Sequence, residues 1–399
     1  MQYRRFGKTE LKMPVFSCGG MRYQQSWTDM PLDEVEAANQ ANLEATIRRA
    51  LELGVTHIET ARGYGSSERQ LGVLLPTLPR DELIVQTKIE PHADALVFRD
   101  QFEESLDRLG LEHVDLLGLH GVNNHEVYWH TIKPDGCLAM ARRLQAEGKV
   151  RHVGFSTHAS PDLVLDAVRT EAHGGFDYVN LHWYYIYQRN WPAVAAAAER
   201  DLGVFIISPA DKGGRLYKPS ERLVELCDPL HPLVMNCLFC LARPEVHTLS
   251  IGASCPSDFD LQMTALPMLD RAAELTGPIV ERLDAAMRDA VGADVAERYL
   301  EGLPDWERTP GMMNLATILW LRGLALAYGM TEYGQMRYNL LGNGGHWFEG
   351  LNPSNCGDWD SEKLAKAVKD SPFADRIEGW ILETNDLLGG AEVKRLSQS

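Results

Sequence analysis

The stretch HIETARGYGSSERQLG, residues 57–72, joins the end of an apolar run to the start of a helix. The residues THIET are typical of a strand end, and SSERQLG is typical of a helix start. Tyr64 lies at the junction, with Glu59 at the strand end before it. A carboxylate and a phenol at one strand-to-helix junction raise the question of what they do there, and the rest of the chain supplies the context.

Eight apolar runs rich in Val, Ile and Leu recur over the first 255 residues. They are VFSCGG (15–20), THIETA (56–61), LIVQTKI (83–89), VDLLGLH (114–120), VRHVGFST (150–157), YVNLHW (178–183), GVFIISP (203–209) and VHTLSIGA (246–253). Segments with helical periodicity lie between them, and several end in glycine, as helices often do. Eight strands that alternate with helices over about 250 residues predict an α/β fold of the (β/α)8 TIM-barrel class.

An open, doubly wound sheet is the competing arrangement. It usually has fewer strands and a glycine-rich turn after the first one. The first predicted strand here ends in Cys18-Gly19-Gly20-Met21, without the G-x-G-x-x-G pattern, so the barrel is favoured. Residues 1–14 are expected to form a small hairpin at the barrel bottom. We predict a barrel domain over residues 1–265 and a mostly helical carboxyl-terminal extension, without iron–sulfur clusters, over residues 266–399.

Charge and composition argue against several classes of function. The formal net charge of −17 disfavours a nucleic-acid partner, which requires a basic face. No apolar run approaches the ~20 residues of a membrane helix, and the amino terminus lacks the apolar segment of a secretory signal. The seven cysteines are scattered, which suits reduced thiols in a cytosol. We expect a soluble cytoplasmic protein, and the sequence carries no signal for an oligomeric state.

Polar side chains stand at three successive predicted strand ends, where the chemistry of a TIM barrel is located. They are Glu59 with Tyr64, Lys88, and His120. A lysine inside an apolar strand is costly to bury without a partner, and Glu59 on the neighbouring strand is the obvious one. A buried cation beside a phenol favours the phenolate. We therefore expect Lys88 to lower the pKa of Tyr64 and make it a general acid.

Each of these residues alone is weak evidence for a site. A single strand-end histidine is more often a hydrogen-bonded structural residue, and a Glu–Lys pair is more often structural than catalytic. Four polar groups on three successive strand ends favour a site in which His120 orients a carbonyl oxygen.

The run ETARGYGSSERQLG, Lys88 in QTK, His120 in LLGLH and the segment GKVRHVGFST together resemble the aldo-keto reductase superfamily. The resemblance covers almost all of the first 265 residues. It implies a (β/α)8 barrel that binds NADP(H) and reduces carbonyl groups without a metal. By this resemblance Tyr64 donates the proton, Lys88 and Glu59 tune it, and His120 positions the substrate carbonyl. Glu59 stands where most of the superfamily has Asp, and it keeps the charge.

The same resemblance implies a set of cofactor-binding residues along the strand ends and the loops after them. They are Gly20, Met21, Ser156, Thr157, Asn180, Ile207, Ser208, Lys212, Gly252, Ser254, Asp258 and Gln262. Thr157 and Asn180 differ from the usual Asn and Gln but can still form hydrogen bonds, whereas Ile207 replaces an aromatic ring that often stacks on the nicotinamide. Lys212 is suited to a pyrophosphate.

The cofactor assignment depends on one acidic residue. Asp258 stands near the place where the family often has a basic residue for the 2′-phosphate. An acid suits a free ribose hydroxyl better than a phosphate. We expect NADP as the cofactor, and NAD stays open.

Residues 309–350 resemble the carboxyl-terminal module of aldo-keto reductases that carry a ferredoxin-like domain. Those relatives have C-x2-C-x2-C-x3-C-P runs, whereas Cys356 is alone in this region, and one thiolate cannot hold a cluster that needs about four. Cys237 and Cys240 lie in an apolar stretch and are expected to pack in the core. The segment 315–330 is predicted to be a helix. His346 and Trp347, in the glycine-rich stretch after it, are candidates to cover the barrel mouth, although plain packing at the surface is the more common role of such residues.

These features favour an oxidoreductase that reduces small aldehydes or ketones with a nicotinamide cofactor. The altered extension keeps a second hypothesis open, in which the chain is a catalytically weak barrel subunit that senses a cofactor or binds a partner. Turnover on simple carbonyl compounds discriminates between the two.

Overall fold

The structure is a computed structural model, and it describes residues 1–343, 348–357 and 359–391. The chain divides into two compact units. One contains Met1–Gly213 and Asn236–Ala272, and the other contains Gly214–Met235 and Ala273–Ser399. The predicted domain border at residue 265 stays a prediction. His346 and Trp347 lie outside the described residues.

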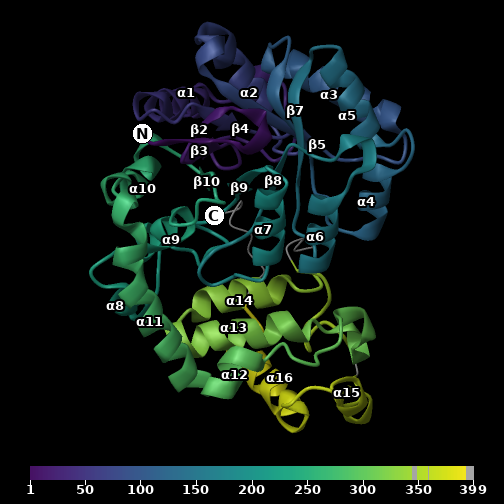
Figure 1. Cartoon of the computed structure of the whole chain (residues 1–399), viewed down its shortest axis with the longest axis vertical. Coiled ribbons are helices and arrows are strands. Elements are labelled where there is room, and N and C mark those ends of the chain that lie inside the picture. The colour runs from purple at the N-terminus through teal and green to yellow at the C-terminus, as the bar shows by residue number, and fades with distance from the viewer. Residues whose placement is uncertain (344–347, 358, 392–399) are drawn as a thin grey trace. The chain divides into compact units, whose positions relative to one another are not determined.

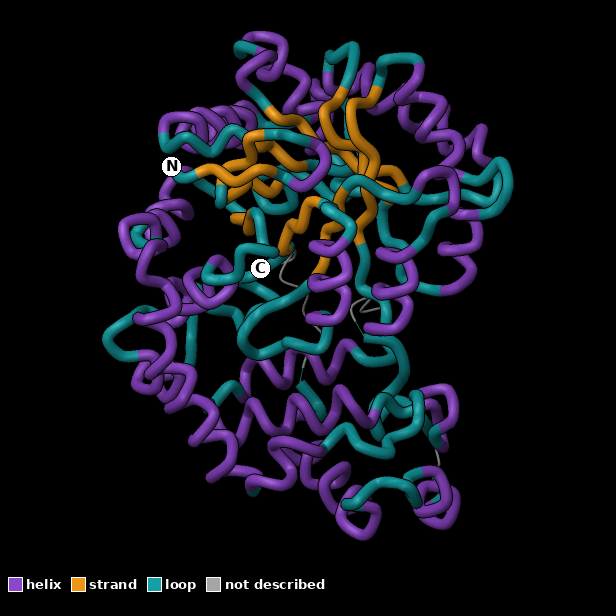
Figure 2. The backbone as a smooth tube through the Cα atoms, viewed as in Figure 1, coloured by secondary structure: helices purple, strands orange, loops and turns teal. Residues whose placement is uncertain are grey.

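The first unit is built around a closed barrel of eight parallel strands, with helices on its outside (Figures 1 and 2). The order of strands around the barrel is β10-β3-β4-β5-β6-β7-β8-β9. Their bounds are β3 (Phe16–Gly19), β4 (His57–Glu59), β5 (Ile84–Ile89), β6 (Val114–Leu119), β7 (Val150–Ser156), β8 (Tyr178–Leu181), β9 (Gly203–Ile206) and β10 (Thr248–Ile251). Each strand lies within one of the eight predicted apolar runs, so the predicted TIM barrel is confirmed.

The amino-terminal residues form the predicted hairpin, in which β1 (Tyr3–Arg5) pairs with β2 (Lys12–Pro14) in antiparallel register. Phe6, at its turn, enters a buried cluster with Met13, Ile84, Leu116, Tyr178 and Phe205. A Cβ atom on Gly203, the first residue of β9, would lie 2.6 Å from the Phe6 ring. The hairpin therefore fills the end of the barrel at which the strands begin.

Helices follow the strands of the first unit along the chain. They are α1 (Ala37–Glu52), α2 (Ser67–Leu74), α3 (Ala95–Leu109), α4 (His125–Ile132), α5 (Cys137–Ala146), α6 (Pro161–Arg169), α7 (Trp191–Glu199) and α10 (Asp260–Met263), while α9 (Pro232–Leu241) begins in the second unit. Helix α3 shows why they form here. The Asp94 side chain caps its first turn, Gly110 ends it at a φ of 64°, and Phe98, Phe102 and Leu106 form its buried stripe.

The described part of the second unit is helical. Its helices are α8 (Glu221–Cys227), α11 (Ala272–Val291), α12 (Ala293–Arg298), α13 (Leu315–Tyr328), α14 (Thr331–Leu340), α15 (Ser361–Ala367) and α16 (Ala374–Leu388). The predicted helix over residues 315–330 is confirmed as α13, which packs against α14 and α16 and is buried on most of its faces. Asn314 caps its start and Gly329 ends it.

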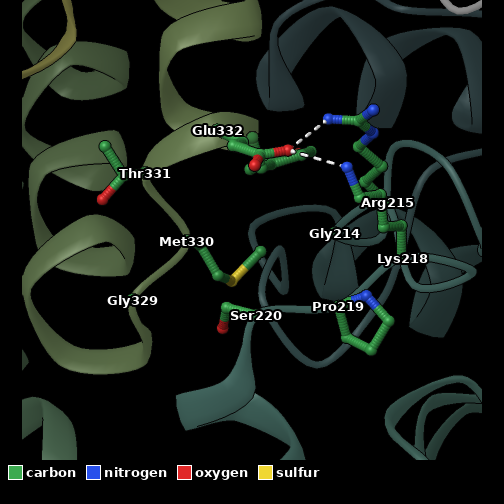
Figure 3. A pocket seen from close by; sticks show the side chains of 10 residues that line it. Gly214, Arg215, Lys218, Pro219, Ser220, Gly329, Met330, Thr331 and Glu332 are labelled. Carbon is green, nitrogen blue, oxygen red and sulfur yellow. Dashed lines mark hydrogen bonds and ion pairs between the residues drawn. The ribbon is translucent and has the colours of Figure 1, made fainter.

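A pocket in the second unit is lined by residues 214–220 and 329–333 (Figure 3). Glu332 accepts a hydrogen bond of 2.9 Å from Arg215 and lies 3.7 Å from the ammonium of Lys218. Ser220 caps α8 and donates to the carbonyl of Tyr328 at 2.6 Å. These polar contacts join the two segments to each other. The charges of Arg215, Lys218 and Glu332 therefore have a structural role.

Two properties of the described helices complete the fold. No single helix in the described ranges has both the length and the apolarity of a membrane span; α8 and α9 reach them only as a pair bent by 52°. Cys237 and Cys240 on α9 are buried free thiols, as the apolar sequence around them predicts.

Candidate active site

Lys88 stands at the centre of a buried polar cluster at the carboxyl ends of β4 and β5. Glu59 is the last residue of β4, and Lys88 precedes the last residue of β5. The Lys88 ammonium contacts the Glu59 carboxylate and donates to the carbonyl of Thr60 at 2.8 Å and to the hydroxyl of Tyr64 at 3.2 Å. Lys88 is 2% exposed and Glu59 is 3% exposed. The structure thus brings together the acid, the cation and the phenol that the sequence predicts.

Tyr64 is held over Lys88 by a tight turn between β4 and α2. Its amide donates to the carbonyl of Ala61 at 3.0 Å, and its carbonyl accepts from the amide of Ser67 at 3.1 Å. Gly65 follows with a φ of +53°, and a Cβ atom there would lie 1.9 Å from the carbonyl oxygen of Ser26. Only glycine fits this position. The turn places the Tyr64 hydroxyl 3.4 Å from the Glu59 carboxylate.

His120 completes the cluster from the end of β6. Its amide donates to the carbonyl of Ile89 at 2.7 Å, and its ring stands edge-on to Tyr64, with centroids 5.7 Å apart. Burial, and then the charges of Lys88 and Lys212, lower the pKa of His120 to about 3. The ring is therefore neutral near pH 7. Its Nδ1 is buried and has no hydrogen-bond partner among the described residues.

The electrostatics of Tyr64 differ from the sequence-based expectation. Burial raises the pKa of Tyr64, and burial lowers the pKa of Lys88 well below its usual value. The prediction that Lys88 depresses the pKa of Tyr64 is therefore wrong, because removal from water outweighs the neighbouring cation. The phenol keeps its proton at neutral pH, which is the form that a proton donor requires.

Ser156, Thr157 and Asn180 lie together, because β7 and β8 pair with Ser156 opposite Asn180. The Ser156 hydroxyl accepts from the amide of Gly121 at 3.1 Å, and the Thr157 hydroxyl donates to the carbonyl of Val122 at 2.7 Å. Both hydroxyls therefore support the loop after β6. The Asn180 side chain is fully buried, and neither amide atom has a hydrogen-bond partner in the described ranges. An orphaned buried amide fits the carboxamide of a nicotinamide.

The loop after β9 carries the predicted phosphate contacts. Ile207 is half-buried and packs against the barrel cluster that contains Phe205. Ser208 adopts a φ of 53°, and its carbonyl accepts from the amide of Lys212 at 2.9 Å. This turn brings the Lys212 ammonium to 3.3 Å from Nε2 of His158. Lys212 thus lies at the carboxyl ends of the strands, where a pyrophosphate contact was expected.

The residues predicted for the other end of the cofactor lie after β3 and β10. Asp258 accepts hydrogen bonds of 2.7 Å from both the amide and the hydroxyl of Ser254. Arg22 donates to the carbonyl of Gly252 at 3.0 Å and lies 3.9 Å from Asp258. The site therefore contains a cation beside the acid, and the sequence alone did not indicate this cation.

Gly20, Met21 and Gln262 are three further residues that the sequence predicts to bind the cofactor. The Gly20 amide donates to the carbonyl of Glu59 at 2.7 Å, and a Cβ atom there would lie 2.7 Å from that same oxygen. The Met21 carbonyl accepts from the side chain of Gln24 at 3.1 Å. Gln262 is buried, and its Oε1 has no hydrogen-bond partner among the residues that the structure describes.

Other residues of the site were not identified from the sequence. Trp27, 41% exposed, presents its ring edge-on to Tyr64 with centroids 6.2 Å apart. His158 directly follows Thr157, and its ring lies beside that of His182, with centroids 4.6 Å apart. The aromatic residue in the loop after the first strand, and the histidine beside Thr157, were the available signals.

The described residues contain no group of three or more His, Cys, Asp and Glu side chains that could hold a metal ion. The absence of an iron–sulfur cluster stays a prediction, to be tested by iron analysis.

Comparison with known proteins decides the family. The model of the Aldo/keto reductase family matches residues 16–217, just over half of the 399-residue chain. The chain belongs to the aldo/keto reductase family. The expected membership is thus confirmed, while the resemblance of residues 309–350 to the branch with a ferredoxin-like domain stays a prediction.

Curated relatives within this family match part of the chain. It is 31% identical over 175 residues to L-glyceraldehyde 3-phosphate reductase of Escherichia coli (strain K12), a match of 40% of this chain and 46% of that protein. It is 30% identical over 165 residues to L-galactose dehydrogenase of Arabidopsis thaliana, with 39% and 48% covered. The chain thus spans about half the length of these relatives.

Solved structures resemble the fold. Aldo-keto reductase AKR11C1 from Bacillus halodurans, in its holo form, superposes with a TM-score of 0.59 at 19% identity and covers 71% of this chain and 96% of that one. At this identity the likeness supports the barrel fold alone.

Proposed function

We propose that this aldo/keto reductase family member reduces the carbonyl group of small aldehydes or ketones with a nicotinamide cofactor, and that Tyr64 is its general acid. One observation carries the proposal: Lys88 contacts both the carboxylate of Glu59 and the hydroxyl of Tyr64 at the carboxyl end of the barrel. In TIM-barrel enzymes this is the end at which the chemistry takes place.

A bound nicotinamide would supply the hydride for the carbonyl carbon. Asn180 would hold its carboxamide, since the buried amide otherwise has no partner among the described residues. Lys212 would meet the pyrophosphate, and Ser254 with Asp258 would face the ribose of the adenosine part. Ile207 offers an aliphatic surface in place of the aromatic ring common in the family.

Four residues of the chain would take part in protonating and orienting the substrate carbonyl. Tyr64 gives its phenolic proton to the carbonyl oxygen, and the raised pKa of Tyr64 means that the phenol is protonated at neutral pH before the reaction. Lys88 donates a hydrogen bond to the Tyr64 oxygen and stabilises the phenolate that remains. Glu59 holds Lys88 in place. His120, neutral because its pKa is lowered to about 3, orients the carbonyl.

The cofactor preference rests on the pair Asp258 and Arg22. The acid favours a free 2′-hydroxyl, as in NAD, whereas Arg22 at 3.9 Å offers a positive charge for the 2′-phosphate of NADP. We keep NADP as the proposed cofactor, and NAD as the alternative.

The test has two steps. NADPH and NADH are first titrated while protein fluorescence is followed, and quenching with at least one of them is expected. Turnover is then measured on aldehydes and quinones, on glyceraldehyde 3-phosphate and on an aldose, because two relatives are named for compounds of these kinds. A protein that binds neither cofactor would contradict the proposal. Binding without turnover on the whole panel would favour the catalytically weak cofactor-sensing or partner-binding subunit.

A further inference from the structure

A line of hydrogen-bonded side chains, formed by two histidine rings and one tyrosine hydroxyl, crosses the carboxyl ends of β7, β8 and β9 in the first unit. The Lys212 ammonium lies 3.4 Å from Nδ1 and 3.3 Å from Nε2 of His158. Nδ1 of His158 contacts Nε2 of His182, and Nδ1 of His182 contacts the hydroxyl of Tyr184. The Tyr184 hydroxyl ends the line on the backbone carbonyl of Ile207, at 2.5 Å.

The carbonyl at the end of this line fixes the direction of every bond in it. A carbonyl oxygen only accepts, so the hydroxyl of Tyr184 donates to Ile207. The Tyr184 oxygen therefore accepts from an Nδ1–H on His182. In neutral rings, which carry one N–H each, Nε2 of His182 is then an acceptor and Nδ1 of His158 a donor. Both histidines are thus assigned the Nδ1–H tautomer by one backbone oxygen.

The line is rigid as well as directional. Tyr184 is fully buried and His182 is 1% exposed. The backbone is fixed on both sides, because the amide of His158 donates to the side chain of Asn123 at 2.7 Å and the carbonyl of His182 accepts from Asn190 at 2.9 Å. The planes of the two rings differ by only 16°, as a hydrogen bond between their edges requires. Each ring therefore has one orientation.

Lys212 rests against the His158 ring that this line orients. With its Nδ1 protonated, the His158 ring accepts a hydrogen bond from the Lys212 ammonium on Nε2, at 3.3 Å. A neutral ring tolerates an adjacent ammonium, whereas a protonated ring would place two positive charges side by side. In this neutral tautomer the ring proton of His158 is directed toward His182 and away from Lys212.

We propose that Tyr184, His182 and His158 are positioning residues for Lys212, and that they hold its ammonium where the phosphates of a nicotinamide cofactor bind. This inference rests on the proposed function, because the cofactor supplies the phosphates that Lys212 would meet. Tyr184 is two side chains away from Lys212 along the line. A change at Tyr184 is therefore transmitted to the cofactor through the two histidines.

The first experiment measures the dissociation constant of NADPH for Tyr184→Phe, Lys212→Met and the double variant. Tyr184→Phe is expected to weaken binding by about 3- to 10-fold, the effect of one lost hydrogen bond. In the Lys212→Met background the same change should have no further effect, because its action passes through Lys212. Tyr128→Phe is the matched control: it also removes a hydroxyl that donates to a backbone carbonyl, that of Asp166. It should bind NADPH as the wild type does.

The second experiment reads the tautomers directly, in the wild-type protein, by ¹⁵N nuclear magnetic resonance of the histidine rings. Both His158 and His182 should show a protonated Nδ1 and an unprotonated Nε2, and Tyr184→Phe should remove this single pattern. Protonated Nε2 on either ring of the wild type would overturn the inference even if a variant fails to fold. Unchanged NADPH affinity in Tyr184→Phe, or an equal loss in both backgrounds, would also overturn it. If the wild type binds neither NADPH nor NADH, the proposed function fails as well.

Discussion

The ammonium nitrogen of Lys88 lies 3.2 Å from the hydroxyl oxygen of Tyr64, at the junction between a barrel strand and the helix that follows it. Burial shifts the pKa values of these two groups in opposite directions. It raises the pKa of Tyr64, so the phenol is protonated before reaction, and it lowers that of Lys88. After the proton has left, the lysine donates a hydrogen bond to the negatively charged oxygen of the phenolate and stabilises it.

Loss of the lysine should destabilise the barrel, because Glu59 is buried and would lose its partner. We expect Lys88→Met to lower the free energy of unfolding by about 3–5 kcal/mol, the cost of breaking a buried ion pair from one side. Urea unfolding measures this change. The double variant Lys88→Met/Glu59→Gln should recover most of the stability without recovering turnover. A single variant as stable as the wild type would show that the pair does not support the fold.

Replacing Asn180 with an apolar residue should stabilise the fold and weaken the binding of NADPH. Its amide is buried without a hydrogen-bond partner among the described residues, and leucine has a similar volume. Asn180→Leu should therefore raise the free energy of unfolding by about 1–3 kcal/mol and weaken NADPH binding. Asn190→Leu is the matched control, since the Asn190 side chain donates to the carbonyl of His182, and this variant should be less stable. Asn180→Leu with lower stability and unchanged affinity would remove Asn180 from the cofactor site.

Stability should fall in mild acid, and the buried histidines His57 and His120 should contribute to this fall. Burial lowers the pKa values of both His57 and His120 to about 3, while an unfolded histidine titrates near ~6.5. At pH values between these two pKa values, both histidines are protonated in the unfolded chain and neutral in the folded chain. The folded state therefore loses about 1.4 kcal/mol per pH unit for each histidine as the pH falls below ~6.5. Urea unfolding from pH 7 to pH 5 measures the slope, which should be shallower in His120→Asn and unchanged in the control His125→Ala, an exposed position. A wild-type slope equal to that of His120→Asn would contradict this account.

The choice between the two nicotinamide cofactors should depend on the charge of Asp258. Asp258→Asn keeps an oxygen for the amide and hydroxyl of Ser254 but removes the negative charge. The affinity for NADPH relative to NADH should rise by about fivefold or more, since a unit charge about 4 Å away is worth at least about 1 kcal/mol. Asp260→Asn, which affects the exposed pair with Arg49, is the control. An equal ratio in the two variants would place the 2′-position elsewhere.

Sequence reasoning reached the parts of this structure that depend on local pattern. Runs of Val, Ile and Leu locate all eight barrel strands, because a strand buried on both faces is continuously apolar. The contact between Glu59 and Lys88 follows from the rule that a buried lysine needs a partner, once their strands are neighbours.

The remaining features depend on burial and on loop conformation. The expected pKa shift of Tyr64 had the wrong sign, because a sequence does not show how deeply its hydroxyl is removed from water. The cation Arg22 beside Asp258 comes from a separate loop. Lys212 reaches His158 through a turn in which Ser208 has a φ of 53°. A serine in the sequence does not indicate this left-handed backbone conformation. The hydrogen bond from the Thr157 hydroxyl to the carbonyl of Val122 depends on the conformation of the loop after β6.

The central claim is that Tyr64 supplies the proton, and a single-turnover measurement on Tyr64→Phe tests it most directly. Enzyme loaded with NADPH is mixed with an aldehyde that the wild type reduces, and the loss of reduced nicotinamide is followed in time. The variant should bind NADPH with unchanged affinity and react about 10²- to 10⁴-fold more slowly, the usual contribution of one general acid. Reaction of the variant at the wild-type rate would contradict the account and assign the proton to another group.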